Sequence, residues 1–140
     1  MKAFLLMSAV GLGMALATGG YASGSVTLRE DPEFLYDLHC SGCHKQDGSG
    51  QGVFVPRLKD EMAVLLRKPG GREYMLQVPG VSQSSLSDAD VAKVMNWALS
   101  RFDAEHLPSD FKPFTAAEVA RFRHAPLSDA TRVRAQIMAK

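Results

Sequence analysis

The sequence predicts an all-α protein, for two reasons. No segment of useful length alternates apolar and polar residues as a β-strand does, whereas several segments join a helix-start signal to apolar residues at helical spacing. The 140 residues allow one main domain. With 46% hydrophobic and 22% charged residues, the chain has the composition of a globular protein with a core. Its formal net charge of +1 is far below that of nucleic-acid-binding proteins, so we expect no nucleic-acid partner.

Residues 1–22 have the pattern of a secretory signal peptide. A positive start at Lys2 is followed by an uncharged run over residues 3–17, and the small residues Gly20 and Ala22 suit a signal peptidase site. The run is shorter than the roughly 20 apolar residues of a membrane-spanning helix. We therefore expect cleavage near Ala22, a periplasmic location and no stable membrane anchor after cleavage.

The first helix of the mature chain is predicted to run into Cys40. Asp31 can accept hydrogen bonds from the free amides at a helix start, and Pro32 suits the first helical position. Three glycines within residues 45–56 then mark a loop. Helical signals return over residues 58–67.

The clearest helix is predicted to follow Ser87. A short helix over residues 72–78 precedes it, between a Pro-Gly-Gly and a Pro-Gly break. Residues 87–90 resemble a capping box, with aspartate in place of the usual glutamate. Apolar residues then recur at helical spacing. They are Val91, Val94, Met95, Ala98 and Phe102.

Residues 103–140 are predicted to form a helical extension. Residues 108–113 begin and end with proline and indicate a linker. Thr115 and Glu118 are the two ends of a capping box that opens a short helix, and residues 127–129 open another, with Ser128 as its start signal. We expect this extension to cover a functional site or to dock a partner.

The motif that carries chemistry is Cys40-Ser41-Gly42-Cys43-His44, a C-x-x-C-H sequence typical of c-type haem attachment. Two thiols three positions apart on one turn can each form a thioether with a vinyl group of the porphyrin. The adjacent imidazole then serves as an axial iron ligand. The sequence predicts one haem c, bound covalently through Cys40 and Cys43, with His44 as the metal ligand.

Other uses of the two cysteines fit less well. A zinc site needs further soft ligands, and the chain has no other cysteine. A thioredoxin-like redox pair normally sits in a βαβ unit, which this helical pattern lacks. A zinc site and a simple disulfide remain as alternatives to haem.

Residues 31–102 resemble the class I cytochrome c family. The resemblance rests on the C-x-x-C-H motif at the end of the first helix and on residues 87–91, which are similar to the usual opening of the family's last core helix. It implies a cytochrome c-like bundle of about four core helices around the haem. The predicted organisation is a signal peptide (1–22), a haem domain (23–102) and the helical extension (103–140).

The resemblance also implies roles for three further residues. Phe34 and Trp97 look like the aromatic pair at the crossing of the first and last core helices. Pro56 is similar to the family's proline whose carbonyl accepts a hydrogen bond from the second nitrogen of the iron-ligating histidine. Such a bond orients the ring and raises its basicity as a ligand.

The sixth iron ligand is left open. Family members usually place a methionine in the loop before the last core helix, but here residues 78–86 contain neither methionine nor histidine. Met95 belongs to the apolar face of its helix, which favours core packing. His124 requires the extension to fold back over the haem. The candidates are a vacant or water-bound site and the side chains of Met62, Met75, Met95 and His124.

The expected function is a periplasmic mono-haem cytochrome c that carries single electrons between a dehydrogenase and a downstream acceptor. Such a carrier needs no catalytic residue, so we expect no enzyme activity. The missing loop methionine motivates an alternative, an open iron site that binds a diatomic gas or peroxide near Gln83, Ser84 and Ser85. A second alternative is a haem subunit of a larger oxidoreductase complex, docked through the extension.

Overall fold

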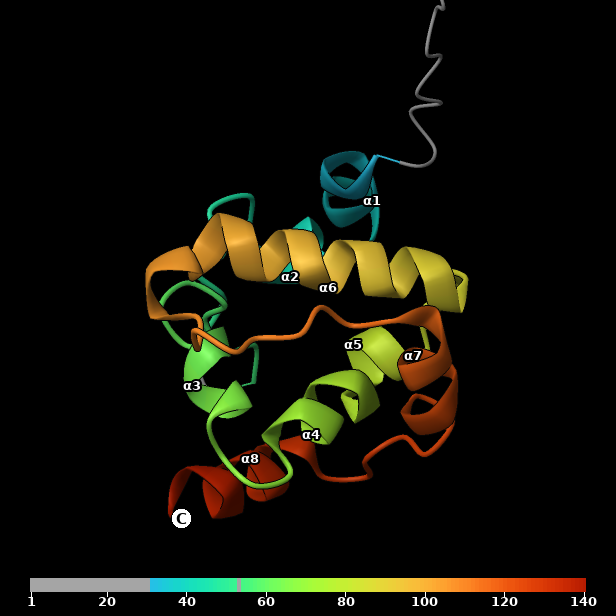
Figure 1. Ribbon diagram of the computed structural model, residues 1–140. Helices are drawn as coiled ribbons and strands as arrows, with labels where there is room; N and C mark the ends of the chain where they lie inside the picture. Colours follow the sequence, from blue (N-terminus) through green and yellow to red (C-terminus); the bar gives the residue numbers. More distant parts are fainter. Residues whose placement is uncertain (1–30, 53) are drawn as a thin grey trace, which may run out of the picture.

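The computed structural model describes residues 31–52 and 54–140, so the predicted signal peptide and its cleavage site near Ala22 lie outside the described residues. The described part of the chain is helical, with one isolated antiparallel bridge between Gln51 and Val55 (Figure 1). The all-α prediction is confirmed. Over the same residues, no helix has the length and apolar character needed to cross a membrane.

The helices follow the predicted order closely. They are α1 (Pro32–His39), α2 (Ser41–His44), α3 (Met62–Leu66), α4 (Gly71–Gln77), α5 (Pro79–Ser82), α6 (Asp88–Phe102), the 3-10 helix η2 (Ala104–His106), α7 (Ala116–Phe122) and α8 (Ala130–Met138). Four of them begin at a side chain that accepts a hydrogen bond from a free backbone amide. The caps at Asp31, Ser87 and Thr115 are the predicted ones, whereas α8 is capped by Asp129, one residue after the predicted Ser128.

Two further boundaries differ from the prediction. The helix expected over residues 58–67 begins only at Met62, because Asp60 has a left-handed backbone with φ of 61° that a right-handed helix cannot contain. The break expected at Pro79 is instead the first residue of α5. Proline is well tolerated there because its missing N–H would have no partner in the helix.

Helices α1 and α6 pack against each other through aromatic rings, but not through the predicted pair. Tyr36 is 1% exposed, and its ring centroid lies 5.1 Å from that of Trp97 and 5.2 Å from that of Phe102. Phe34 is 41% exposed, so its assignment to this contact was wrong. Residues two apart on a helix point to nearly opposite sides, and the side facing α6 is the one that carries Tyr36.

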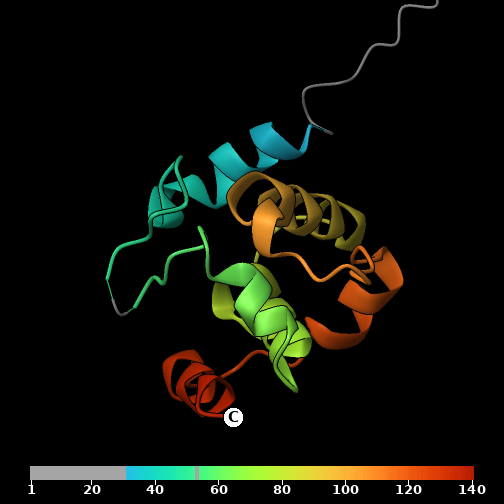
Figure 2. The same cartoon turned by 60° about the vertical axis from the view of Figure 1, so that its left-hand side comes forward.

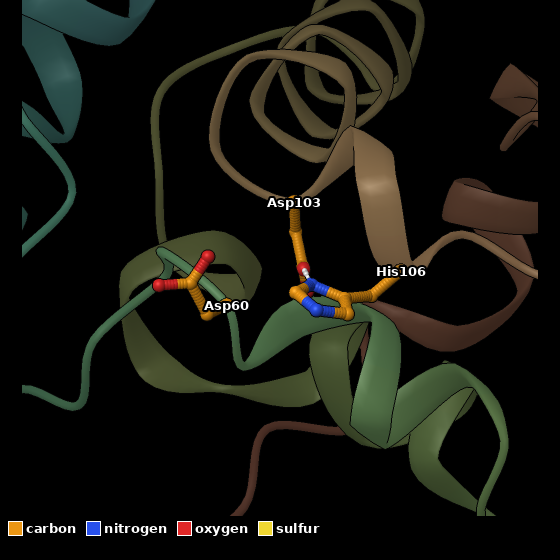
Figure 3. A group of neighbouring side chains, drawn as sticks. All are labelled: Asp60, Asp103 and His106. Atoms are coloured by element: carbon orange, nitrogen blue, oxygen red, sulfur yellow. Dashed lines mark hydrogen bonds and ion pairs between the residues drawn. The ribbon is translucent and has the colours of Figure 1, made fainter.

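The end of α6 is tied to the start of α3 by a buried carboxylate. Asp103 accepts a hydrogen bond from the backbone N–H of Ala63 at 2.6 Å. It accepts another from Nδ1 of His106 at 2.7 Å (Figure 3). Asp60 lies beside this pair. The Asp103 contacts set the position of α3 relative to α6.

The extension is part of the same helical body. Helix α7 packs on α6 and α4, and α8 packs on α4. The Asn96 side chain pairs with both backbone groups of Phe114, at 2.7 and 2.9 Å. The buried guanidinium of Arg123 donates to the carbonyls of Ser84 and Leu86 and to Asp88. These bonds hold the predicted helical extension against the core.

Candidate functional site

A cavity of about 460 Å³ lies between the helices and has Cys40, Cys43 and His44 in its wall. Its size is within the range of about 300–1,000 Å³ that is usual for cofactor sites. The remaining wall is mostly apolar and comes from segments spread along the chain. Its aliphatic members include Leu58, Leu65, Val78, Val81, Val94 and Ala98. The fold thus brings the motif together with an enclosure suited to a large apolar group.

The two cysteines flank the junction of α1 and α2. Cys40 follows the last residue of α1 and is half-buried, whereas Cys43 lies in α2 and is exposed; both are free thiols. Burial raises the pKa of the Cys40 thiol to about 11, and the charge of Cys43 adds to this rise. A thiol with such a pKa is protonated at neutral pH, unlike the reactive thiolate of a disulfide oxidoreductase. This environment fits an anchoring role better than a redox pair.

His44 is oriented by a backbone carbonyl. Its Nδ1 lies 3.1 Å from the carbonyl oxygen of Pro56, so the hydrogen bond predicted between these residues is present. Donation from Nδ1 leaves Nε2 as the atom with a free lone pair, the arrangement that a metal-ligating histidine requires. Burial holds the pKa of His44 below its usual value, although the Pro56 bond acts in the opposite direction. The imidazole is therefore neutral and available as a ligand.

The loop between His44 and Pro56 depends on Gly50. Its φ is +69°, and a Cβ at this position would lie 2.4 Å from the carbonyl oxygen of Val55. Its N–H donates to the His44 carbonyl, and the neighbouring Gln51 side chain donates to the carbonyls of Gly42 and Cys43. Sequence reasoning placed a loop here but missed this role, for which the closely spaced glycines were the signal.

Three of the four candidate sixth ligands line the cavity. Met62, Met75 and Met95 are all buried in its wall. His124 is exposed and lies outside the wall, because it follows α7, a helix that packs on α6 and α4 and contributes no residue to the cavity. The His124 candidate is therefore wrong.

The segment before α6 meets the cavity through apolar groups. Residues 78–81 line the wall, whereas Gln83, Ser84 and Ser85, the polar groups expected beside an open iron site, do not. The reason is that the Ser84 carbonyl accepts from Arg123, and its hydroxyl donates to the Val81 carbonyl. Both bonds hold Ser84 against neighbouring residues and away from the cavity wall.

Polar side chains that sequence reasoning missed also line the cavity. Tyr74 comes from α4 and Arg134 from α8 in the extension, together with Ala130 and Thr131. Nη2 of Arg134 lies 2.5 Å from Oε2 of Glu61. No local signal distinguished Arg134 from the other arginines of this segment, since its placement depends on how α8 packs against α4.

The residues present fit a covalently attached haem. Cys40 and Cys43 stand at the edge of the cavity, a neutral imidazole is in its wall, and an apolar enclosure completes it. Cys40, Cys43 and His44 belong to the segment that the cytochrome c resemblance covers, whereas part of the enclosure comes from the extension.

Comparison with known proteins agrees with this geometry. No protein-family model matches the chain. A cytochrome c-552 of Thermus thermophilus is 31% identical over 123 residues, in a match that covers 75% of this chain and 82% of the relative. A second cytochrome c-552 of Thermus thermophilus is 33% identical over 107 residues, in a match that covers 64% of this chain and 82% of the relative. The chain belongs to the class I mono-haem cytochrome c family.

Proposed function

We propose that this c-type cytochrome carries single electrons between a dehydrogenase and a downstream acceptor in the periplasm. The observation that carries the proposal is the placement of Cys40, Cys43 and the Pro56-bonded His44 in the wall of one apolar cavity. The pattern of residues 1–22 supports export to the periplasm.

Each residue of the site has a part in holding the cofactor. Cys40 and Cys43 would form the two thioethers, and Nε2 of His44 would bind the iron. When bound, the haem supplies one-electron exchange between ferric and ferrous iron. The Pro56 carbonyl keeps the imidazole in one orientation, which limits rearrangement of the ligand between the two states.

The rim of the cavity supports exchange with protein partners. Cys43 is exposed, and Phe54, which also lines the cavity, is 89% exposed. An exposed aromatic ring at a cofactor edge offers apolar contact to a partner without requiring a substrate pocket. We therefore expect electrons to enter and leave at this edge, which makes the protein a carrier rather than an enzyme.

A second candidate function rests on residues 78–86. This segment holds no methionine or histidine, and its cavity-lining part, residues 78–81, is apolar. If none of the buried methionines binds the iron, its sixth position is open to a diatomic gas or peroxide.

A permanent haem subunit of a larger complex would instead be recovered with its partner chains on size-exclusion chromatography.

The attachment chemistry is tested by replacing the thiols. The double substitution Cys40→Ala and Cys43→Ala is expected to abolish haem that survives denaturing electrophoresis and acidic acetone extraction. Ser41→Ala is the matched control, because its hydroxyl only donates to the Asp37 carbonyl and is exposed. Retention of covalent haem by the double variant would overturn the proposal. Electron transfer is tested separately: if the proposal holds, voltammetry of the native, haem-loaded protein gives one reversible one-electron wave.

A further inference from the structure

The Arg134 guanidinium of the extension is incompletely paired. Its Nη2 donates to Glu61, but its Nε is buried and has no hydrogen-bond partner among the described residues. The side chain lines the same cavity as the haem-attachment motif. A buried N–H without an acceptor is costly and uncommon in folded proteins, so an acceptor for this atom is expected.

The chemistry of the guanidinium defines that acceptor. Arginine presents five N–H donors in a planar fork and pairs most strongly with carboxylates. Glu61 takes up one end of the fork, which leaves Nε free for a second carboxylate. Arg57, which also lines the cavity, is different because its partner Asp60 and its own side chain are both about half exposed to water.

A haem carries two carboxylates, and they lie on the edge opposite the vinyl groups. The thioethers of Cys40 and Cys43 would fix the vinyl edge beside α1 and α2. Helix α8 lies at the other end of the described fold from α1, as both views show (Figures 1 and 2). The carboxylate edge would therefore face the part of the wall that α8 supplies.

We propose that Nε of Arg134 donates a hydrogen bond to a haem propionate while Glu61 holds the other end of the guanidinium. The extension then belongs to the haem site itself. This inference rests on the covalent haem of the proposed function. Arg134 would be a positioning residue that keeps the propionate ionised, because a nearby positive charge favours the charged form of a carboxyl group.

The positive charge of Arg134 affects the pKa of Tyr74, another residue of the cavity wall. Burial raises the pKa of Tyr74, and the positive charge of Arg134 opposes that rise. Apart from the haem-attachment residues, other charged or titratable groups line the cavity or pair with Arg134 and can influence the pKa of a propionate. They must stay unchanged in the Arg134 variants. They are Tyr36, His39, Arg57, Glu61 and Tyr74.

The test is the reduction potential of the purified haem-loaded protein, measured between pH 5 and pH 9. Ionisation of a propionate adds negative charge near the iron, which stabilises the ferric form, so the potential falls as pH rises through its pKa. Arg134→Leu removes the nearby positive charge and is expected to raise the propionate pKa, so that the potential falls at a pH higher by about one unit or more. Arg134→Lys, which keeps the charge but not the fork, should move it less.

Two further variants separate this role from a purely structural one. Arg132→Leu is the matched control, since Arg132 lies on the same helix, is exposed and pairs with Asp129. In Glu61→Gln the potential should fall at the same or a lower pH, because the propionate is then the only carboxylate that pairs with the guanidinium. If Arg134 only paired with Glu61, Arg134→Leu and Glu61→Gln would lose the same amount of stability. Neither substitution would then shift the pH at which the reduction potential falls.

The outcomes distinguish the two proposals. A native protein without covalent haem would overturn the proposed function. A native protein with covalent haem, but with the same pH profile in Arg134→Leu and Arg134→Lys as in the native chain, would overturn this inference and leave the carrier function standing. Loss of folding in Arg134→Leu leaves Arg134→Lys to decide.

Discussion

Nδ1 of His44 lies 3.1 Å from the carbonyl oxygen of Pro56, twelve residues further along the chain. The loop between them reaches this position through the left-handed backbone of Gly50, whose N–H donates to the His44 carbonyl. The orientation of the proposed iron ligand therefore depends on Gly50, a residue outside the C-x-x-C-H motif.

Gly50→Ala is expected to destabilise the protein more than Gly52→Ala. Both glycines have positive φ, which costs an alanine about 1–2 kcal/mol. A Cβ at Gly50 would also lie 2.4 Å from the Val55 carbonyl, whereas one at Gly52 would meet no described atom within 4 Å. Denaturant unfolding of the haem-loaded variants measures the difference. Equal losses would show that the Val55 contact has no effect on the loop.

Met75→Leu is expected to open the sixth iron position. Met75 lies on α4, which leads directly into residues 78–81, the apolar segment that stands where the family usually carries its ligand loop. Leucine has a similar volume, so the stability cost should be below about 1.5 kcal/mol. Binding of imidazole to the oxidised protein, followed optically, should become rapid in this variant.

The matched controls are the other two methionines of the cavity wall. Met62→Leu and Met95→Leu should bind imidazole as slowly as the native protein, because this prediction gives the ligand role to Met75 and leaves both of these side chains to pack in the wall. Rapid binding in either variant, with slow binding in Met75→Leu, would transfer the ligand role to that methionine.

The aromatic contact between α1 and α6 depends on Tyr36. Tyr36→Ala is expected to cost about 3–5 kcal/mol, because a buried ring that packs on Trp97 and Phe102 is lost. Phe34→Ala should cost far less, since that ring is 41% exposed. Thermal unfolding of the two variants compares the costs. A larger loss in Phe34→Ala would contradict the observed packing.

Asn96 is expected to hold the extension to the core. Asn96→Ala leaves the backbone N–H and carbonyl of Phe114 without their partner, at about 1–3 kcal/mol for each group that stays buried. Limited proteolysis should then release a fragment containing α7 and α8 at a lower protease concentration. Ser100→Ala, an exposed change on the same helix, should behave as the native chain. Equal proteolysis of the two variants would argue that other contacts hold the extension.

Local signals account for what the sequence predicted well. The caps at Asp31, Ser87 and Thr115 act on amides two or three residues away, so their helix starts could be placed without the fold. The C-x-x-C-H motif is likewise contained in a few consecutive residues, so it could be recognised without the fold. The His44 and Pro56 contact, although distant along the chain, came from the family resemblance.

Tertiary packing decided what the sequence could not predict. Tyr36 rather than Phe34 faces Trp97 because of how α1 is rotated against α6, and both residues are aromatic. The late start of α3 depends on the left-handed backbone at Asp60, a residue type that adopts that conformation only in some contexts. The entry of Arg134 into the cavity wall depends on the docking of α8, to which its own sequence gives no clue.

The central proposal is that this chain carries single electrons through a covalent haem, and the Met75 prediction adds that the protein fills the sixth iron position. The most direct test is the optical spectrum of the oxidised protein before and after addition of cyanide, followed by reduction and exposure to carbon monoxide. We expect low-spin iron with a sulfur-to-iron charge-transfer band, slow or no reaction with cyanide, and no carbon monoxide complex. High-spin iron that binds cyanide at once would contradict the claim and would favour gas or peroxide chemistry at an open sixth position.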